Sequence, residues 1–269
     1  MVGTAGGSGG RDGVRLRVDR VSERIHFAHT EHVNWVIYSG PDGVTLVDSG
    51  YTGQRALLEA SLDAVGVGPA DVAAVLLTHG HADHLGGAAW LAEEFGTPVH
   101  THPLELANVR RDILEQAGPA GVLRNAWRPG VVPWALAIVP LLGGHADLGV
   151  PSATAAPMCG GERGERVDVP GRPRMRLVDG HTTGHTVFEF DDEGVVVVGD
   201  ALVTRHRTSP LLGPHLLPSM FHRDAARARE SVGAIGWSTA RVVLPGHGEA
   251  WIGPARAAAE AAREAGAPW

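Results

Sequence analysis

Three histidines and one aspartate lie within six positions of the segment Leu76–Gly87, LLTHGHADHLGG. They are His79, His81, Asp83 and His84. Imidazole nitrogens and carboxylate oxygens together bind borderline-soft divalent metals, zinc first and iron or manganese next. The cluster directly follows Ala73–Thr78, a continuous apolar run that is typical of a strand buried on both faces. Chance placement of such a cluster there is improbable, so the pattern favours a metal site.

Three later apolar runs also end in a histidine or an aspartate, and these residues are His181, Asp200 and His247. A single residue of this kind at a strand end usually caps a turn or lies at the surface. In an α/β sheet, however, strand ends on one edge lie close together even when they are far apart in sequence. We therefore expect all these residues to converge, with His79 and His81 on one ion and Asp83 and His84 turned toward a second.

Residue patterning predicts an α/β protein in which each half of the chain runs through strands, a helix and a strand. Strands are expected at residues 14–20, 24–28, 34–40, 44–48, 73–78, 175–179, 186–190, 194–200 and 241–246. Helices are expected at residues 55–65, 86–96, 104–117, 224–235 and 254–265. Residues 118–173 are rich in Gly, Pro and Trp and are expected to be irregular.

Several motifs of the chain, in this order, resemble those of the metallo-β-lactamase superfamily. THGHADH resembles its signature, and its other motifs are similar to LVDSG at 46–50, GHTTGH at 180–185, VVGDAL at 197–202 and LPGHGEAW at 244–251. The resemblance covers nearly the whole chain outside the N-terminal tail and residues 118–173, and the set of metal motifs is like that of glyoxalase II. It implies a four-layer αβ/βα sandwich of two similar halves, with a two-metal site on one edge.

The resemblance also implies which residues hold each ion. The first site would use His79, His81 and His181, and the second Asp83, His84 and His247, with Asp200 bridging them. Within GHTTGH the family pattern places the ligand at His181 and leaves His185 beside the site. Asp48 matches a buried strand-end aspartate of the family and is expected to orient a ligand histidine, although a turn-capping role is the alternative.

Two metal ions about 3.5–4 Å apart can share a hydroxide, because the pKa of bound water falls to roughly 7. We expect two divalent ions, zinc first with iron or manganese as alternatives, and the shared hydroxide as the nucleophile. Asp83 is the expected catalytic residue, because it would bind a metal and orient the proton of the hydroxide. One ion would polarise the carbonyl or phosphoryl oxygen of the substrate.

The composition of the chain limits which classes of protein it can belong to. The chain has 269 residues, 43% of them hydrophobic, a net charge of −7 and a single cysteine, Cys159. These values favour a globular protein without a nucleic-acid partner, without a membrane partner and without an internal disulfide. Residues 1–12 are expected to form a flexible tail without a secretion signal, and 13–269 a single cytoplasmic domain. A small-molecule substrate is expected, and a homodimer remains open.

Features that are typical of some branches of the superfamily are missing from this sequence, which argues against those branches. Asp200 stands where the commonest true metallo-β-lactamases have a cysteine, and DALVTRH lacks the tyrosine typical of acyl-homoserine lactonases. The chain ends 22 residues after His247, so the glutathione-binding region of glyoxalase II is expected to be missing. His81 excludes the flavodiiron pattern. A metal-dependent hydrolase of a small ester, thioester or lactone remains.

Three alternatives stay open at this point: a mononuclear iron persulfide dioxygenase, a phosphodiesterase acting on RNA, and a non-catalytic binding protein. The last is disfavoured because every ligand position is filled. Substrate-binding residues are not identified, but residues 118–173, which include Trp127 and Trp134, are a predicted insertion forming a lid or an apolar pocket wall. A dimer contact or plain packing is the alternative. His29 or His32 could also contact substrate.

Overall fold

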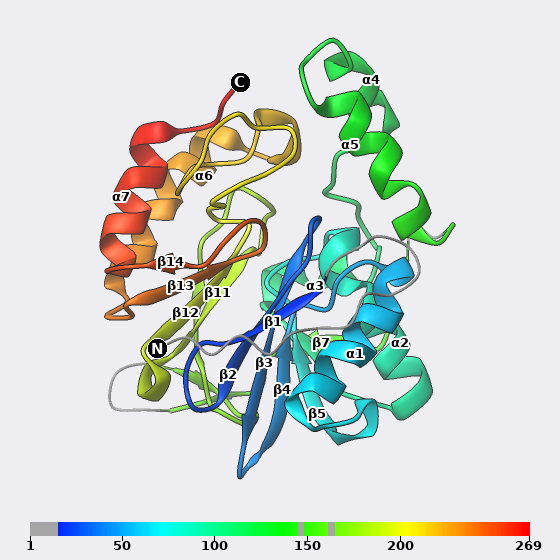
Figure 1. Ribbon diagram of the computed structural model, residues 1–269, viewed down its shortest axis with the longest axis vertical. Helices are drawn as coiled ribbons and strands as arrows, with labels where there is room; N and C mark the ends of the chain where they lie inside the picture. The colour runs from blue at the N-terminus through cyan, green and yellow to red at the C-terminus, as the bar shows by residue number, and fades with distance from the viewer. Residues whose placement is uncertain (1–15, 145–147, 161–164) are drawn as a thin grey trace.

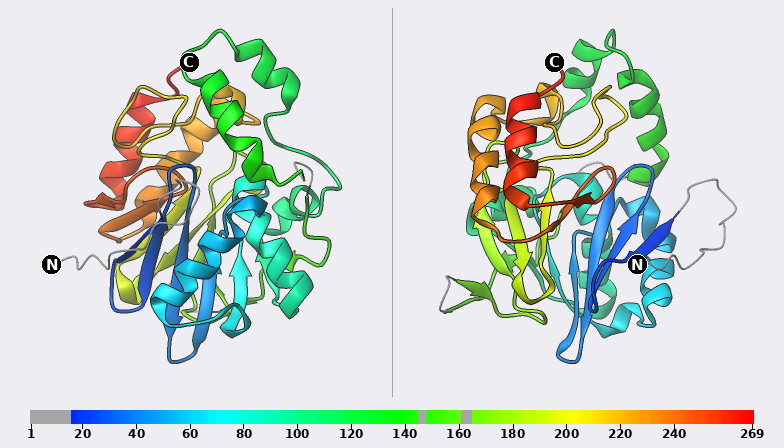
Figure 2. Two further views of the ribbon diagram at one scale, coloured as in Figure 1. Left: turned by 45° about the vertical axis from the view of Figure 1, so that its right-hand side comes forward. Right: turned by 60° about the vertical axis from the view of Figure 1, so that its left-hand side comes forward.

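Two seven-stranded sheets pack face to face, and helices cover the outer face of each (Figure 1). The computed structural model describes residues 16–144, 148–160 and 165–269. The predicted tail, residues 1–12, lies outside these ranges. The layers run helices, sheet, sheet, helices, so the predicted αβ/βα sandwich of two similar halves is confirmed (Figure 2).

The first sheet is formed by the first seven strands, which lie side by side in the order of the chain. They are β1 (Arg17–Arg20), β2 (Ile25–His29), β3 (Asn34–Gly40), β4 (Gly43–Val47), β5 (Val72–Leu76), β6 (Val99–Thr101) and β7 (Thr154–Ala155). Pairing is antiparallel from β1 to β4 and parallel from β4 to β7. Helices α1 (Arg55–Val65) and α2 (Ala82–Phe95) pack on its outer face.

The second sheet runs in the reverse order, from β14 to β8. Its strands are β8 (Met158–Cys159), β9 (Arg166–Val167), β10 (Arg174–Leu177), β11 (Thr186–Phe190), β12 (Val195–Gly199), β13 (Val242–Pro245) and β14 (Trp251–Ile252). Only β12 and β13 pair in parallel. Helices α6 (Ala225–Ser231) and α7 (Ala255–Ala265) cover its outer face.

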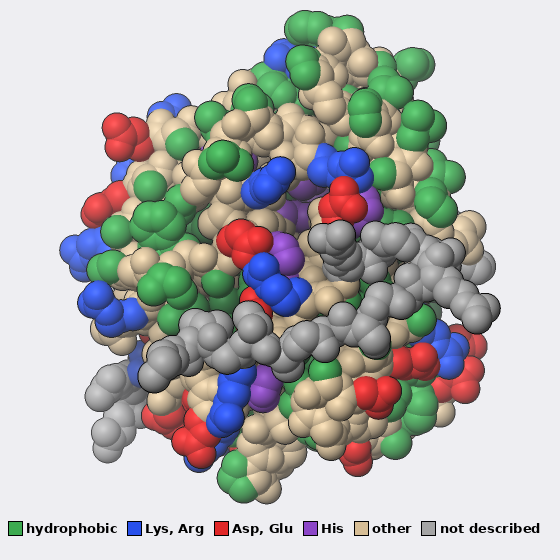
Figure 3. Space-filling view, in the orientation of Figure 1, with side chains coloured by type: hydrophobic (Ala, Val, Ile, Leu, Met, Phe, Trp, Pro, Cys, Tyr) green, Lys and Arg blue, Asp and Glu red, His purple; other side chains and the backbone are tan. Residues whose placement is uncertain are grey.

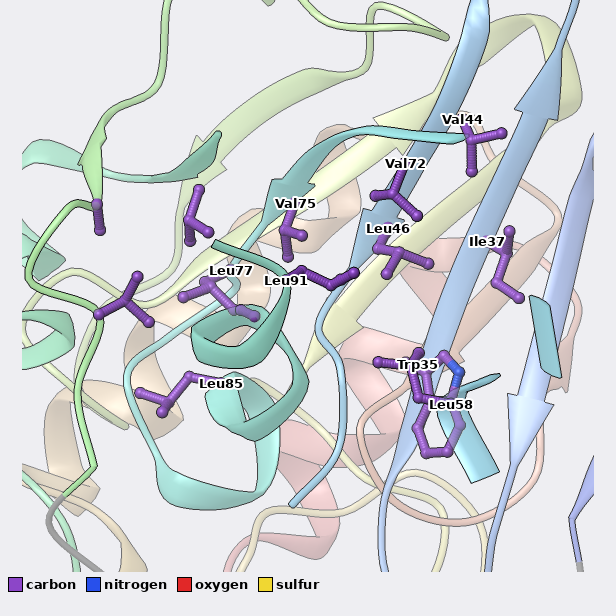
Figure 4. Close-up of a cluster of buried hydrophobic side chains, with 14 of the residues drawn as sticks. Trp35, Ile37, Val44, Leu46, Leu58, Val72, Val75, Leu77, Leu85 and Leu91 are labelled. Carbon is purple, nitrogen blue, oxygen red and sulfur yellow. The ribbon is translucent and has the colours of Figure 1, made fainter. Parts of the chain in front are cut away.

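Apolar side chains point to both faces of the central strands, which explains why the sheets are buried on both sides. On β3, Trp35 and Ile37 point toward α1 and α2, where they join the cluster shown in Figure 4. The intervening Val36 and Tyr38 point into the layer between the two sheets. Successive side chains of a strand point to opposite faces, so each central strand supplies two cores at once.

The segment predicted to be irregular, residues 118–173, consists of two different parts. Its first part forms α4 (Pro119–Asn125) and α5 (Val131–Ile138), which stand above the sheets at the edge where the chain leaves β5 (Figure 1). Its second part supplies β7, β8 and β9, which lengthen the edges of both sheets. The expectation of irregular structure was therefore wrong for the first part, whereas most described residues of the second part lie outside its three two-residue strands.

The helix predicted at residues 104–117 is mostly absent, and only α3 (Leu106–Val109) forms. Arg111 adopts a positive φ of 69°, and the side chain of Asn108 accepts a hydrogen bond from the backbone of Glu115. A side chain that bonds the backbone in this way competes with the helical ladder. The chain turns back here toward the edge where the candidate ligands lie.

Short 3₁₀ turns connect many of these elements. They are Thr52–Gln54, Pro69–Asp71, Pro103–Glu105, Pro140–Leu142, Asp191–Glu193, Ser219–Phe221 and Val232–Trp237. Among the described residues, no helix has the length and apolar character needed to cross a bilayer.

Candidate metal centre

Three imidazoles converge at one edge of the sandwich. The Nε2 atom of His181 lies 3.2 Å from Nε2 of His79 and 3.1 Å from Nδ1 of His81. His79 and His81 follow β5, whereas His181 follows β10, so both sheets contribute. All three side chains are buried. The structure thus brings these three predicted ligands together, and with Asp200 they form one group that could hold a metal ion.

A second group lies beside the first and contains Asp83, His84 and His247. Asp83 and His84 belong to the first turn of α2, whereas His247 follows β13. The Oδ2 atom of Asp83 lies 3.4 Å from Nε2 of His247 and 3.8 Å from Nε2 of His84. The strand-end residues that the sequence pattern singled out are therefore neighbours in space.

Asp200, at the end of β12, lies between the two groups. Its Oδ2 atom is 3.6 Å from Nε2 of His181 and 3.3 Å from Nε2 of His247. Its Oδ1 atom is 3.5 Å from Nε2 of His84. A single carboxylate thus reaches both groups, which is the position required of a bridging ligand.

Asp48 fixes the rings of His84 and His79, the first directly and the second through Thr78. Its carboxylate accepts hydrogen bonds from the Thr78 backbone and hydroxyl, and it lies 2.8 Å from Nδ1 of His84. The Thr78 hydroxyl donates to Asp48, so it must accept from Nδ1 of His79, 3.0 Å away. Both imidazoles therefore carry a proton on Nδ1 and turn Nε2 toward the centre. Asp48 itself has a φ of 60°, a strained conformation typical of functional sites.

Backbone carbonyls fix two further histidines. Nε2 of His81 lies 2.6 Å from the carbonyl oxygen of Glu115, and Nδ1 of His247 lies 2.5 Å from that of His32. A carbonyl can only accept, so each of these nitrogens carries the proton. The opposite nitrogen of each ring faces the centre.

A fifth histidine is held by another histidine. Nε2 of His222 lies 3.0 Å from the carbonyl oxygen of Leu217 and must donate to it. Nδ1 of His222 is then an acceptor, and it lies 3.1 Å from Nδ1 of His181. His181 therefore donates through Nδ1 and presents a bare Nε2. Sequence analysis did not include His222 among the candidate site residues, because its partner His181 lies far away in the chain.

Two buried atoms of this centre have no hydrogen-bond partner among the described residues. They are Nε2 of His84 and Oδ1 of Asp200. An unpaired buried polar atom costs about 1–3 kcal/mol, so such atoms need an explanation. A divalent cation would satisfy both, and the set of imidazole nitrogens and carboxylate oxygens is the one that zinc accepts. The residues present therefore fit a metal ion.

His185 does not join either group of potential ligands. Its Nε2 atom accepts a hydrogen bond from the backbone amide of Asp200 at 3.1 Å. The ring lies next to those of His79 and His181, with ring centres 5.0 and 5.6 Å away. His185 thus holds the backbone at Asp200 and is not itself in a group of potential ligands. Sequence analysis also placed His185 beside the site.

Two glutamates missed by sequence reasoning connect the metal-binding loops. Glu105 is fully buried, and its carboxylate accepts four hydrogen bonds, from the backbones of Gly80 and Gly184 and the side chains of Asn108 and Thr182. It therefore ties the loop of His79 and His81 to the loop of His181. The Glu115 carboxylate accepts from the backbone and hydroxyl of Thr183 in the same loop.

Helix α2 approaches the loop after β4 so closely that glycine is required. A Cβ atom on Gly86 would lie 2.1 Å from the backbone nitrogen of Thr52, and one on Gly87 would lie 2.6 Å from the carbonyl oxygen of Ser49. Ser49 also donates to the backbone of His84 through its hydroxyl. This contact sets the position of the first turn of α2, which carries Asp83 and His84.

The pKa values of the histidines shift in opposite directions in the two groups. Burial lowers the pKa of His79, His81 and His181, and for His79 and His181 repulsion between neighbouring imidazoles adds to this effect. These three rings are therefore neutral near pH 7 and available as ligands.

The second group behaves in the opposite way. Burial also lowers the pKa of His84 and His247, but nearby carboxylates outweigh it. Asp48 raises the pKa of His84 well above its usual value, and Asp200 raises that of His247 to about 10. Burial raises the pKa of Asp83, yet attraction to these two imidazoles brings it down to about 2. Asp83 is therefore a carboxylate at neutral pH.

A pocket of about 620 Å³ opens beside His247. The turn between β2 and β3 forms one wall with His29 and His32, and the loop after Asp200 forms another. Trp134 of α5 closes the pocket and packs near His206, whose ring lies 4.9 Å from that of His247. The predicted pocket-lining role thus fits Trp134, whereas Trp127 does not line this pocket and is 75% exposed.

The profile of the metallo-β-lactamase superfamily matches residues 30–247. The "Probable metallo-hydrolase YflN" of Bacillus subtilis is 30% identical over 186 residues, which are 65% of this chain and 64% of that protein. An uncharacterized protein of Mycobacterium tuberculosis is 31% identical over 215 residues, which are 78% of this chain and 81% of that protein. The chain spans 64% and 61% of the two Bacillus subtilis proteins it matches.

Solved structures share the fold. A metallo-β-lactamase family protein from Thermus thermophilus superposes with a TM-score of 0.58 at 27% identity, covering 85% of this chain and 72% of that one. The metallo-β-lactamase SMB-1 superposes with a TM-score of 0.60 at 19% identity, covering 91% and 92%. At 19% identity the second likeness shows the fold alone.

Proposed function

Because the chain belongs to the metallo-β-lactamase superfamily, we propose that it is a dinuclear metal-dependent hydrolase of a small ester, thioester or lactone. The observation that carries this proposal is the orientation of five histidines, each of which bonds an acceptor on its outer side. They are His79, His81, His84, His181 and His247. The other nitrogen of each ring faces the centre, where a divalent cation would bind it and displace the protons that His84 and His247 carry near pH 7, and Asp200 reaches both groups.

We assign the first ion to His79, His81 and His181 and the second to Asp83, His84 and His247, with Asp200 shared. Zinc is the proposed metal, with iron or manganese as alternatives. When bound, two such ions would activate water at neutral pH and polarise the carbonyl oxygen of the substrate.

The chain's own residues complete the reaction. Asp83 is the proposed catalytic residue because it is ionised at neutral pH and only partly buried. Its carboxylate would accept the proton of the attacking water and hold that water in line with the carbonyl carbon. Asp48 and His222 would keep their histidines in the required tautomers throughout. The pocket beside His247 is the proposed place for the rest of a small substrate.

The test is metal content together with a substrate panel. Protein purified without added metal is analysed by elemental mass spectrometry, and then assayed on aryl esters, thioesters and lactones before and after chelation. About two ions per chain and hydrolysis that chelation abolishes are expected. About one iron per chain with oxygen uptake on a persulfide would replace the proposal with the dioxygenase. Turnover confined to bis(p-nitrophenyl) phosphate would replace it with a phosphodiesterase.

A matched pair of variants controls for trace contamination. His247→Ala removes a proposed ligand, and His100→Ala removes a histidine of β6 that bonds Thr154 outside the centre. Only the first variant is expected to lose metal and activity together. Equal activity in both variants would mean that a contaminating hydrolase produces the signal.

A further inference from the structure

The pocket beside His247 has charged walls. Figure 3 shows histidine side chains inside a hollow, with arginine and acidic side chains around its mouth. Arg205, Arg207, Glu31 and Glu249 all line this pocket. The charge pairing among these four residues decides which kind of ligand the pocket can hold.

Most of these charges are already paired. Arg207 lies 3.3 Å from Glu31, and Glu249 lies 2.5 Å from Arg17 and 3.4 Å from Nε2 of His29. Arg17 also bonds Asp19.

Arg205 differs from the other arginine of the wall. Within the described part of the chain, its guanidinium has no hydrogen bond and no carboxylate oxygen within 4 Å. Burial raises the pKa of Glu249, whereas a hydrogen bond from Arg17 and longer-range attraction, that of Arg205 included, lower it below its usual value. Arg205 thus supplies one positive charge at the pocket that no neighbouring acid neutralises by direct contact.

The backbone of Arg205 is fixed to the metal-binding loop. The amide of Thr204 donates to the carbonyl of His247, and the Thr204 hydroxyl donates to the carbonyl of Glu249. Gly248, at a φ of +87°, approaches so closely that a Cβ atom there would lie 2.4 Å from the nitrogen of Arg205. The backbone of Arg205 is therefore held beside His247, and its exposed side chain extends from that fixed point.

We propose, building on the hydrolase function above, that Arg205 binds a carboxylate that the substrate carries away from its scissile bond. A guanidinium matches a carboxylate with two parallel hydrogen bonds. One unneutralised guanidinium fits one negative charge, and Glu31 and Glu249 nearby disfavour a dianion such as a phosphate monoester. Trp134 and Leu212, which also line the pocket, would contact the apolar chain between the carboxylate and the ester.

Two esters of one leaving group test the proposal: mono-4-nitrophenyl succinate, which carries a carboxylate, and 4-nitrophenyl butyrate, which is neutral. The metal-loaded wild-type protein is expected to prefer the charged ester. The ratio of the two kcat/KM values should fall about 10- to 100-fold in Arg205→Ala, mainly through KM of the charged ester. Arg205→Lys should recover part of the ratio. Arg124→Ala, an exposed arginine of α4, should keep the wild-type ratio.

The outcomes separate this inference from the hydrolase proposal. Hydrolysis of both esters without preference, or an unchanged ratio in Arg205→Ala, overturns the inference and leaves the hydrolase standing. If the wild type hydrolyses neither ester, calorimetry with the monoanion monomethyl succinate decides the point: binding at least 10-fold weaker to Arg205→Ala supports the carboxylate site, and equal or undetectable binding to both proteins overturns it. Metal content is measured on each variant, so that loss of an ion is not mistaken for loss of the carboxylate site.

Discussion

The Nδ1 atoms of His181 and His222 lie 3.1 Å apart, and the carbonyl of Leu217 holds the proton of His222 on its other nitrogen. Only one of the two facing nitrogens can carry a hydrogen, and it is that of His181. The loop after β12 therefore determines which nitrogen of His181 is free to bind a metal. Loss of an orienting partner of this kind typically lowers metal affinity about 10- to 100-fold.

Replacing His222 should weaken metal binding without removing a ligand. In His222→Ala the ring of His181 loses the acceptor that fixes its tautomer, and the affinity for the first ion should fall about 10- to 100-fold. Titration of metal-free protein with zinc against a competing chelator measures the change. His100→Ala is the matched histidine control, and an unchanged affinity in His222→Ala would refute the orienting role.

Asp83→Asn should leave the fold intact and reduce kcat by about 100-fold or more, because the amide cannot accept the proton of the attacking water. Turnover is measured at saturating metal, so that weaker binding of the second ion does not limit the rate. Circular dichroism checks the fold, and Asp63→Asn on the exposed face of α1 is the control. Near-normal turnover in Asp83→Asn would remove this residue from the mechanism.

The two histidines of GHTTGH should behave differently. His181→Ala should lower the number of ions bound per chain, because one of three nitrogens at the first site is lost. His185→Ala should keep the number of ions, because its Nε2 atom is occupied by the backbone amide of Asp200. Elemental analysis after dialysis distinguishes them, and the reverse pattern would show that the ligand assignment is wrong.

Glu105→Gln should destabilise the protein by about 2–3 kcal/mol. Each carboxylate oxygen accepts two hydrogen bonds, so the amide nitrogen of glutamine would face donors wherever it is placed. Urea unfolding of the metal-free protein measures the change. Glu94→Gln, on the exposed face of α2, should change stability little. Equal midpoints for both variants would contradict the role of Glu105 in joining the loops.

Filling of the second site should release protons. In metal-free protein at pH 7, His84 and His247 are protonated because carboxylates raise their pKa values, to about 10 for His247. A cation must displace these protons, so affinity for the second ion should rise with pH up to about 10. The first site should release none, because burial keeps its histidines neutral. Calorimetry at pH 7 in buffers of different ionisation enthalpy counts the protons, and equal release at both sites would refute this assignment.

The potential ligands were predictable because each follows an apolar strand, and strand ends on one edge of a sheet meet. The same reasoning identified β5, β12 and β13, whereas the sandwich of two halves was implied by the resemblance of the motifs. Asp48 was identified through its motif. These predictions depend on local patterns of residues, and the sequence contains those patterns in full.

The supporting residues were not predictable in this way. Glu105 lies in a segment whose residue pattern predicts a helix. Only the positive φ of Arg111 and the hydrogen bond that Asn108 accepts from the backbone of Glu115 show that the chain turns back. The acceptor for His81 is a backbone carbonyl, which leaves no mark in the sequence. The role of His222 depends on a side-chain orientation that forms only when the whole loop after Asp200 is folded.

Each of the two groups draws ligands from both halves of the chain. His79 and His81 belong to the first sheet and His181 to the second, and His247 of the second sheet faces Asp83 of α2. An ion held there would act as a removable cross-link across the seam between the halves. Its binding free energy would add to the stability of the sandwich, so the protein without the ion would unfold at a lower temperature or denaturant concentration. In a cell, the supply of metal would then govern how long the folded protein lasts.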